Sequence, residues 1–203
     1  MLTPLGPYPH LPILIIFFKN FYLGANRAFQ QPIQINPSNK LTDYYLISLK
    51  PLFRNIYQDN IELVIFGEKK NNETYINGFK ITNIGYLNDE ESLAMLYSSA
   101  DLVIVPSRQE SFSQVCLESI SCGTPVVAFD YSGPRDIIQH QTNGYLAKPY
   151  DPKDLAIGIE WILQSLSKSN ELSLKAREIA IEKFDIKKVA QSHIELYNRI
   201  LLN

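Results

Sequence analysis

From residue 61 onward, short apolar runs alternate with segments whose apolar residues recur at helical spacing. The runs Ile61–Phe66, Leu102–Val105 and Val126–Phe129 are almost wholly apolar, and each is bounded by glycine or proline. Parallel strands that are covered on both faces have this pattern, whereas strands with one solvated face alternate apolar and polar residues. Residues 80–87 form a weaker fourth candidate around Gly85.

The segments between and after these runs predict helices. Asn88 is expected to cap a helix with Glu91 in its first turn, and Asp151 with Pro152 forms an N-cap followed by proline at the first helical position. Residues 170–184 and 186–202 also have helical periodicity. Strands that alternate with helices predict an α/β fold with a doubly wound, Rossmann-like parallel sheet.

The first 60 residues have a weaker pattern. The first strand is either Ile13–Phe18 or residues 21–23, and a helix kinked by Pro51 is expected over residues 41–57. Because four prolines precede residue 13, we interpret residues 1–19 as a linker or irregular segment and residues 20–203 as the domain, with its first strand undecided. Residues 72–74 are expected in a polar loop.

Composition restricts the class of partner. The chain has 203 residues, enough for one large domain, and its 19 basic and 21 acidic residues leave no surplus for a nucleic-acid backbone. The two cysteines lie six apart in one predicted helix and the three histidines are isolated, so we expect no disulfide, no metal site and a reducing cytoplasm. The apolar stretch 11–18 is too short to span a membrane, so no transmembrane segment is expected.

The candidate chemistry lies in residues 106–133, where a strand ends, a polar loop follows, and a helix begins near Ser113. Ligands of doubly wound sheets bind at this carboxyl edge of the strands. We expect Glu110 on the loop and Glu118 on the helix. Between them, the amides of the four residues 111–114 and the positive end of the helix predict a diphosphate site. Carboxylates at its two flanks are suited to accept hydrogen bonds from sugar hydroxyls.

Structural explanations for the same residues remain open. Ser111 and Gln114 also fit an S-x-x-Q capping box, which needs no ligand. Glu118 fits a solvated charge on an exposed helix face equally well. Gly133 and Asp130 follow the strand Val126–Phe129 at the same edge, where either a structural or a ligand-binding role is open.

The spacing of Glu110 and Glu118 resembles the E-x7-E motif of the retaining group 1 (family 4) glycosyltransferases. That family has the GT-B fold, in which the C-terminal of two Rossmann-like domains binds the donor. Further blocks resemble successive parts of that domain, and the resemblance extends from residue 61 to about residue 201. These blocks are residues 63–67, 85–87, 96–97, 100–101, 106–107, 123–128, 133 and 143–146.

The resemblance implies a role for each motif residue. Glu110 would be the catalytic-site acid that holds hydroxyls of the donor sugar, and Glu118 would hold the ribose. The amides around Phe112 and Ser113 would hold sugar and diphosphate. The family generally needs no metal or other cofactor. Lys40 resembles the family's phosphate-binding lysine, although Leu41 replaces the usual glycine, and a solvated surface lysine is the alternative.

The sequence therefore predicts the donor-binding half of a retaining, hexosyl-type glycosyltransferase that binds a nucleoside-diphosphate sugar and serves an unknown acceptor. The acceptor-binding half is expected either in a longer protein from which this chain is cut or in a separately encoded partner, so the isolated chain is expected to need that half for activity. The alternative is a non-catalytic nucleotide-sugar-binding module or truncated remnant. A dinucleotide enzyme is disfavoured, because no G-x-G-x-x-G follows a strand.

Overall fold

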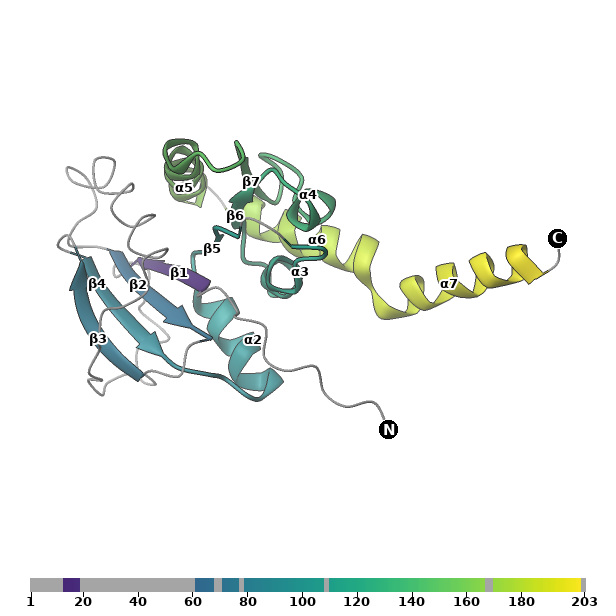
Figure 1. Cartoon of the computed structure of the whole chain (residues 1–203), viewed down its shortest axis with the longest axis horizontal. Helices are drawn as coiled ribbons and strands as arrows, with labels where there is room; N and C mark the ends of the chain where they lie inside the picture. The colour runs from purple at the N-terminus through teal and green to yellow at the C-terminus, as the bar shows by residue number, and fades with distance from the viewer. Residues whose placement is uncertain are drawn as a thin grey trace.

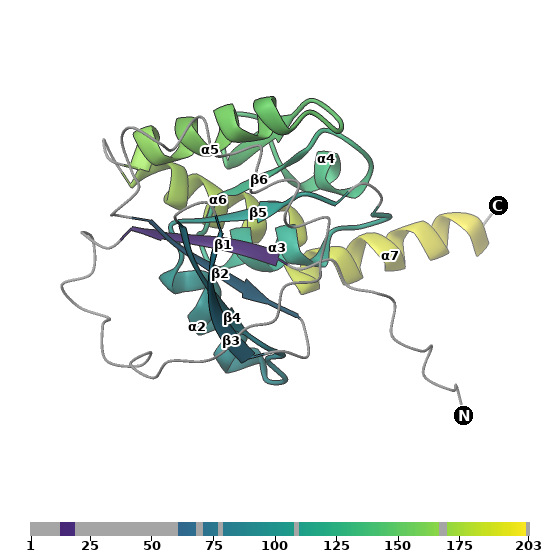
Figure 2. The ribbon, with the colours of Figure 1, turned by 60° about the vertical axis from the view of Figure 1, so that its left-hand side comes forward.

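A single mixed sheet with helices on both faces forms the centre of the fold (Figures 1 and 2). The computed structural model describes residues 13–18, 61–67, 71–76, 79–107, 110–166 and 170–201, the first of these by backbone only. The strand order is β3-β4-β2-β1-β5-β6-β7. The strands are β1 (Ile13–Phe18), β2 (Ile61–Phe66), β3 (Asn71–Ile76), β4 (Phe79–Ile84), β5 (Leu102–Val105), β6 (Val126–Phe129) and β7 (Gly144–Ala147). The helices are α2 (Glu90–Ser99), α3 (Gln114–Ser121), α4 (Gly133–Ile137), α5 (Pro152–Leu166), α6 (Glu171–Phe184) and α7 (Ile186–Leu201).

The parallel part of the sheet confirms the predicted α/β class. β5 pairs with β6, β6 with β7, and β2 with β4, all in parallel register. Every residue of β5 and β6 is buried, because α5 packs on one face of the sheet and α2, α3 and α6 pack on the other. The apolar runs are thus continuous because both faces are covered.

The strand β1 corrects the expected domain boundary. Ile13–Phe18 lies between β2 and β5 and is antiparallel to both, so this part of residues 1–19 belongs to the sheet and is not a linker. The antiparallel direction also makes the sheet mixed, where a parallel sheet was expected. Of the two predicted first strands, Ile13–Phe18 forms a strand; residues 21–23 and the predicted helix over 41–57 lie outside the described residues.

The edge strand β3 replaces the expected polar loop. It forms an antiparallel hairpin with β4, so the prediction for residues 72–74 was wrong. Lys80 on β4 forms ion pairs with Glu73 on β3 (2.7 Å) and with Glu62 on β2 (3.4 Å). These cross-strand pairs link β3 and β2 to β4, in addition to the backbone ladder of the hairpin.

The predicted helices are present, with one shifted cap. Asp89 caps α2 by accepting a hydrogen bond from the Ser92 amide (2.7 Å), so the cap lies one residue after Asn88. At α5, Asp151 accepts from the Lys153 amide (2.9 Å) and Pro152 is the first helical residue, as the sequence predicted. Within the described ranges, no helix has the length and apolar character needed to cross a bilayer.

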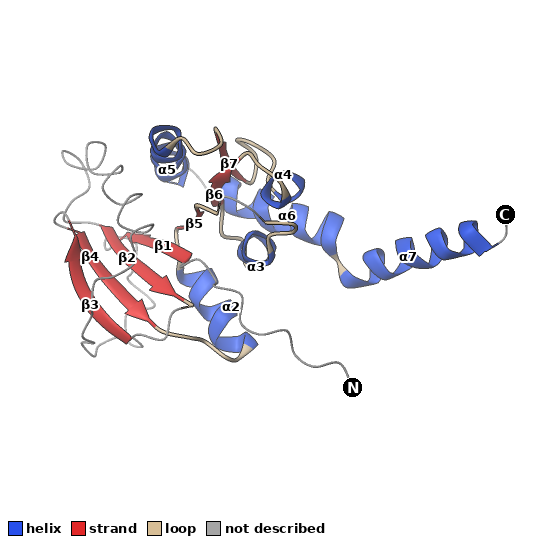
Figure 3. Cartoon of the chain, viewed as in Figure 1, coloured by secondary structure: helices blue, strands red, loops and turns tan. Residues whose placement is uncertain are grey.

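The last two helices differ sharply in burial. α6 buries an apolar side against the core, whereas α7 extends from the body towards the C-terminus and none of its residues is buried (Figures 1 and 3). α7 nevertheless carries an exposed apolar side, with Ile194, Leu196 and Ile200 all about half exposed or more. The helix predicted over residues 186–202 is therefore confirmed as α7, and its apolar side is not covered by any of the described elements.

Candidate functional site

The turn before α3 sets where the helix begins. Ser113 is the N-cap, with its Oγ accepting a hydrogen bond from the Cys116 amide (3.4 Å), and Gln114 is the first helical residue. Ser111 is therefore not the cap, and the S-x-x-Q capping box that Ser111 and Gln114 would form is not present. The structural explanation for those two residues was wrong.

Three backbone amides at this helix start have no hydrogen-bond acceptor among the described residues. They are the amides of Phe112, Ser113 and Gln114. Phe112 and Gln114 are exposed, while Ser113 is buried beneath the turn. The Phe112 ring packs edge-on against Phe184 at the end of α6, with ring centroids 6.4 Å apart. Free amides at the positive end of a helix can bind an anion.

Glu110 lies on this loop with one carboxylate oxygen out of contact with water. Its Oε2 is buried and has no hydrogen-bond partner among the described residues. The negative charge of Glu110 also acts on the Cys116 thiol. Burial, with a smaller contribution from Glu110, raises the pKa of Cys116 to about 12, while a hydrogen bond with Ser113 acts in the opposite direction. A buried carboxylate oxygen without a partner is costly unless a ligand donates to it.

A second loop, after β6, is fixed against the first. The Gly133 amide donates to the Glu110 carbonyl oxygen (3.0 Å). A Cβ added at Gly133 would lie 2.8 Å from the Phe112 Cα and 2.9 Å from the Ser113 nitrogen, so only glycine fits without a backbone shift. The preceding residue, Ser132, has φ 53° and ψ −134°, a conformation that L side chains rarely adopt. Because β5 and β6 are parallel, both loops lie at the carboxyl edge of the sheet.

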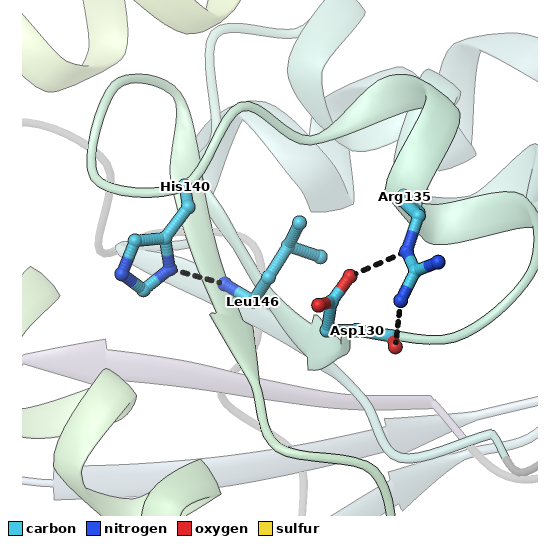
Figure 4. Close-up of polar contacts among 4 residues, drawn as sticks. All are labelled: Asp130, Arg135, His140 and Leu146. Carbon is cyan, nitrogen blue, oxygen red and sulfur yellow. Dashed lines mark hydrogen bonds and ion pairs between the residues drawn. The ribbon is translucent and has the colours of Figure 1, made fainter.

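Asp130 and Arg135 form an ion pair at the same edge (Figure 4). Arg135 Nε donates to Asp130 Oδ1 (2.7 Å), and its Nη2 donates to the Asp130 carbonyl oxygen (3.0 Å). The hydrogen bond and the negative charge of Asp130 raise the pKa of Arg135. Nearby, His140 Nδ1 accepts a hydrogen bond from the Leu146 amide (3.2 Å), which holds the loop between α4 and β7. Sequence reasoning left Asp130 undecided and missed Arg135 as its partner.

Glu118 lies on α3, as predicted, and Glu110 on the preceding loop. Glu118 Oε2 accepts a hydrogen bond from the hydroxyl of Tyr97 on α2 (2.9 Å). Burial, followed by the Glu118 charge, raises the pKa of Tyr97, so this hydroxyl stays protonated. No spacing in the sequence signals this contact, because the two residues lie on different helices.

The predictions for Lys40 and for a metal site concern other parts of the chain than the two glutamates. Lys40 lies outside the described part, so its phosphate-binding role stays a prediction. Among the described residues, no group of three or more histidine, cysteine, aspartate or glutamate side chains is arranged to hold a metal ion. The ligand roles assigned to Glu110, Glu118 and residues 111–114 likewise stay predictions.

Comparison with known proteins connects this geometry to a family. The family described as "Glycosyl transferases group 1" matches residues 40–179. An uncharacterised glycosyltransferase of Methanocaldococcus jannaschii is 32% identical over 118 residues, which are 58% of this chain and 30% of that protein. A D-inositol 3-phosphate glycosyltransferase of Thermobispora bispora is 39% identical over 87 residues, which are 43% of this chain and 20% of that protein. The matched part thus spans less than a third of either relative.

Solved structures give the same result. Anabaena HepE in complex with UDP-glucose matches with a TM-score of 0.52 and 28% identity, over 59% of this chain and 32% of HepE. Sucrose-phosphate synthase from Thermosynechococcus elongatus matches with a TM-score of 0.54 and 32% identity, over 60% of this chain and 30% of that protein. A Rickettsia africae glycosyltransferase, at 19% identity and a TM-score of 0.64 over 91% of this chain, supports the fold alone.

The family match covers well over half of the chain, and it includes both loops, α3 and the two glutamates of the candidate site. The sheet with flanking helices is the Rossmann-like half of a GT-B glycosyltransferase. The chain therefore belongs to the group 1 glycosyltransferases.

Proposed function

We propose that this chain is the donor-binding half of a retaining glycosyltransferase whose donor is a nucleoside-diphosphate hexose. The observation that carries the proposal is the buried Oε2 of Glu110, which has no hydrogen-bond partner among the described residues and belongs to the loop that leads into α3. Sugar hydroxyls would donate to the Glu110 carboxylate, and the amides of Phe112 and Ser113 would hold the diphosphate. HepE, a relative by structure, has been solved with UDP-glucose bound.

In the proposed reaction, the bond between the sugar C1 and the diphosphate oxygen breaks, and a bond from C1 to the acceptor oxygen forms on the same face. The departing diphosphate takes the acceptor's proton, so configuration at C1 is retained and a nucleoside diphosphate is released. Glu110 would orient the sugar ring, and the positive end of α3 would stabilise the negative charge that develops on the leaving group. Lys40 would supply a further positive charge.

Titration calorimetry tests donor binding. UDP, GDP, ADP and UDP-glucose are titrated into the chain, and at least one nucleotide is expected to bind. Glu110→Gln should weaken UDP-glucose binding by more than about tenfold while changing UDP binding little, because this carboxylate is assigned to the sugar. Glu182→Gln, an exposed change on α6, is the matched control. The proposal fails if none of the nucleotides binds at millimolar concentration.

Transfer and binding are separate properties. Binding without sugar transfer to any tested acceptor would favour the alternative, a nucleotide-sugar-binding module that needs a partner for activity. Transfer by the chain alone would contradict the expectation that a separate acceptor-binding domain is required. The acceptor assay therefore follows calorimetry and uses the nucleotide sugar that binds most tightly.

A further inference from the structure

The corner between α2 and α3 contains a buried hydroxyl that reaches an exposed acid. Tyr97 is 1% exposed, and its only charged contact in the described part is Oε2 of Glu118, at 2.9 Å. Glu118 itself is exposed at the surface of α3. The tyrosine therefore supports the carboxylate from the interior, while the other side of the carboxylate faces solvent.

Tyr97 is held rigidly at both ends. Its ring meets Phe66 of β2 edge-on, with centroids 5.8 Å apart and an interplanar angle of 83°. Its carbonyl oxygen accepts a hydrogen bond from Thr124 Oγ1 (2.6 Å). Thr124 is in turn fixed to α3, because its carbonyl oxygen accepts from Ser119 Oγ (2.8 Å). The hydroxyl of Tyr97 thus has one fixed position relative to α3.

The hydrogen bond from Tyr97 occupies one of the two carboxylate oxygens of Glu118, Oε2. No described residue donates to Oε1 of Glu118, and the side chain is exposed. An exposed glutamate normally samples several rotamers, and a ligand must then meet the entropy cost of fixing it. A hydrogen bond from a rigid donor reduces that cost before the ligand arrives.

We propose that Tyr97 is a positioning residue, which holds Glu118 with one oxygen directed at the ribose hydroxyls of the bound nucleotide. The inference rests on the proposed function, which assigns the ribose to Glu118. Tyr97 does not touch the ligand in this arrangement. It acts by fixing the carboxylate, so its effect should depend on the presence of ribose hydroxyls.

The test compares UDP with 2′,3′-dideoxy-UDP by calorimetry on the full chain. The wild type should prefer UDP by about tenfold or more, since hydrogen bonds to a charged group are lost with the hydroxyls. Tyr97→Phe keeps the ring and removes only the hydroxyl, and it should reduce the preference by about threefold or more. Tyr75→Phe, at a 71% exposed tyrosine on β3, is the matched control and should leave the preference unchanged.

A second variant protects the test against a folding defect in Tyr97→Phe. Thr124→Val removes the hydrogen bond to the Tyr97 carbonyl and leaves the hydroxyl in place, so it should reduce the preference by a smaller factor. The inference is wrong if both variants bind UDP and the dideoxy nucleotide with an unchanged ratio, since a merely structural tyrosine would shift both affinities together. If instead no UDP, GDP or ADP binds to the wild type, the proposed function itself fails.

Discussion

The two glutamates of the site are held in different ways. Around Glu110, backbone contacts fix the geometry: the Gly133 amide donates to the Glu110 carbonyl, and the carboxylate has a buried oxygen without a described partner. Around Glu118, side chains fix the geometry, because Tyr97 donates to an exposed carboxylate. One position therefore tolerates almost no change of backbone, while the other depends on a single hydroxyl. The candidate site therefore combines a loop held by its backbone with a carboxylate held by a side chain.

The largest effect is expected at the backbone contact. Gly133→Ala places a Cβ 2.8 Å from the Phe112 Cα, so the two loops must separate, and the free energy of unfolding should fall by about 2 to 3 kcal/mol. Urea denaturation measures the change. Gly67→Ala is the control, because its φ is +88° with no atom within 4 Å, so it should cost only about 1 kcal/mol of backbone strain. Equal losses would show that the close approach carries no cost.

The next effect is on pH dependence. An unfolded thiol has a pKa near 9.0, and burial raises the pKa of Cys116 to about 12 in the fold. Above pH 9 the unfolded state therefore binds fewer protons than the folded state, and stability falls as pH rises. The loss approaches about 1.4 kcal/mol per pH unit for this group. Denaturation between pH 9 and 10 should show a shallower fall in Cys116→Ala than in the wild type.

The buried oxygen of Glu110 predicts a gain of stability when ligand binding is lost. Glu110→Gln neutralises a half-buried carboxylate whose buried Oε2 lacks a described partner, so the free energy of unfolding without ligand should rise by about 1 kcal/mol. Thermal denaturation without nucleotide measures this, with Glu182→Gln as the exposed control. A loss of stability would mean that Glu110 supports the fold, and its assignment to the sugar would lose its main support.

The smallest effect is expected at Ser132. Its φ of 53° with ψ of −134° suits glycine, so Ser132→Gly should relieve strain and raise the free energy of unfolding by about 0.5 to 1 kcal/mol. Ser132→Ala keeps the strained backbone and should show no gain. An increase in both variants would trace the effect to the hydroxyl and not to the backbone.

The elements that depend on local residue patterns could be predicted from the sequence. The buried strands β5 and β6 and the Asp151 cap of α5 follow from residue patterns that act over a few positions. β3 was missed because its sequence is mostly polar, and its pairing with β4 becomes apparent only in the folded hairpin. The place of β1 depends on pairing with β2 and β5, far along the chain, which no local pattern specifies.

In the candidate site, too, the local positions could be predicted and most contacts between segments could not. The position of Glu110 on a loop and of Glu118 on a helix followed from the strand-loop-helix pattern, and the start of α3 was expected near Ser113. The contacts between distant segments did not follow from it. Gly133 against Phe112 and Tyr97 with Glu118 each join elements that meet only in the folded chain, whereas Arg135 with Asp130 is a local contact that the sequence analysis missed.

The position of β1 has a consequence for any shortened version of this chain. β2 and β5 do not pair with each other, so Ile13–Phe18 is the one strand that joins them in the described sheet. Removing residues 1–19 would delete β1 and leave two interior strand edges, each with a row of unpaired amides and carbonyls. Such a fragment should aggregate through those edges even though every helix and both glutamates of the site are still present.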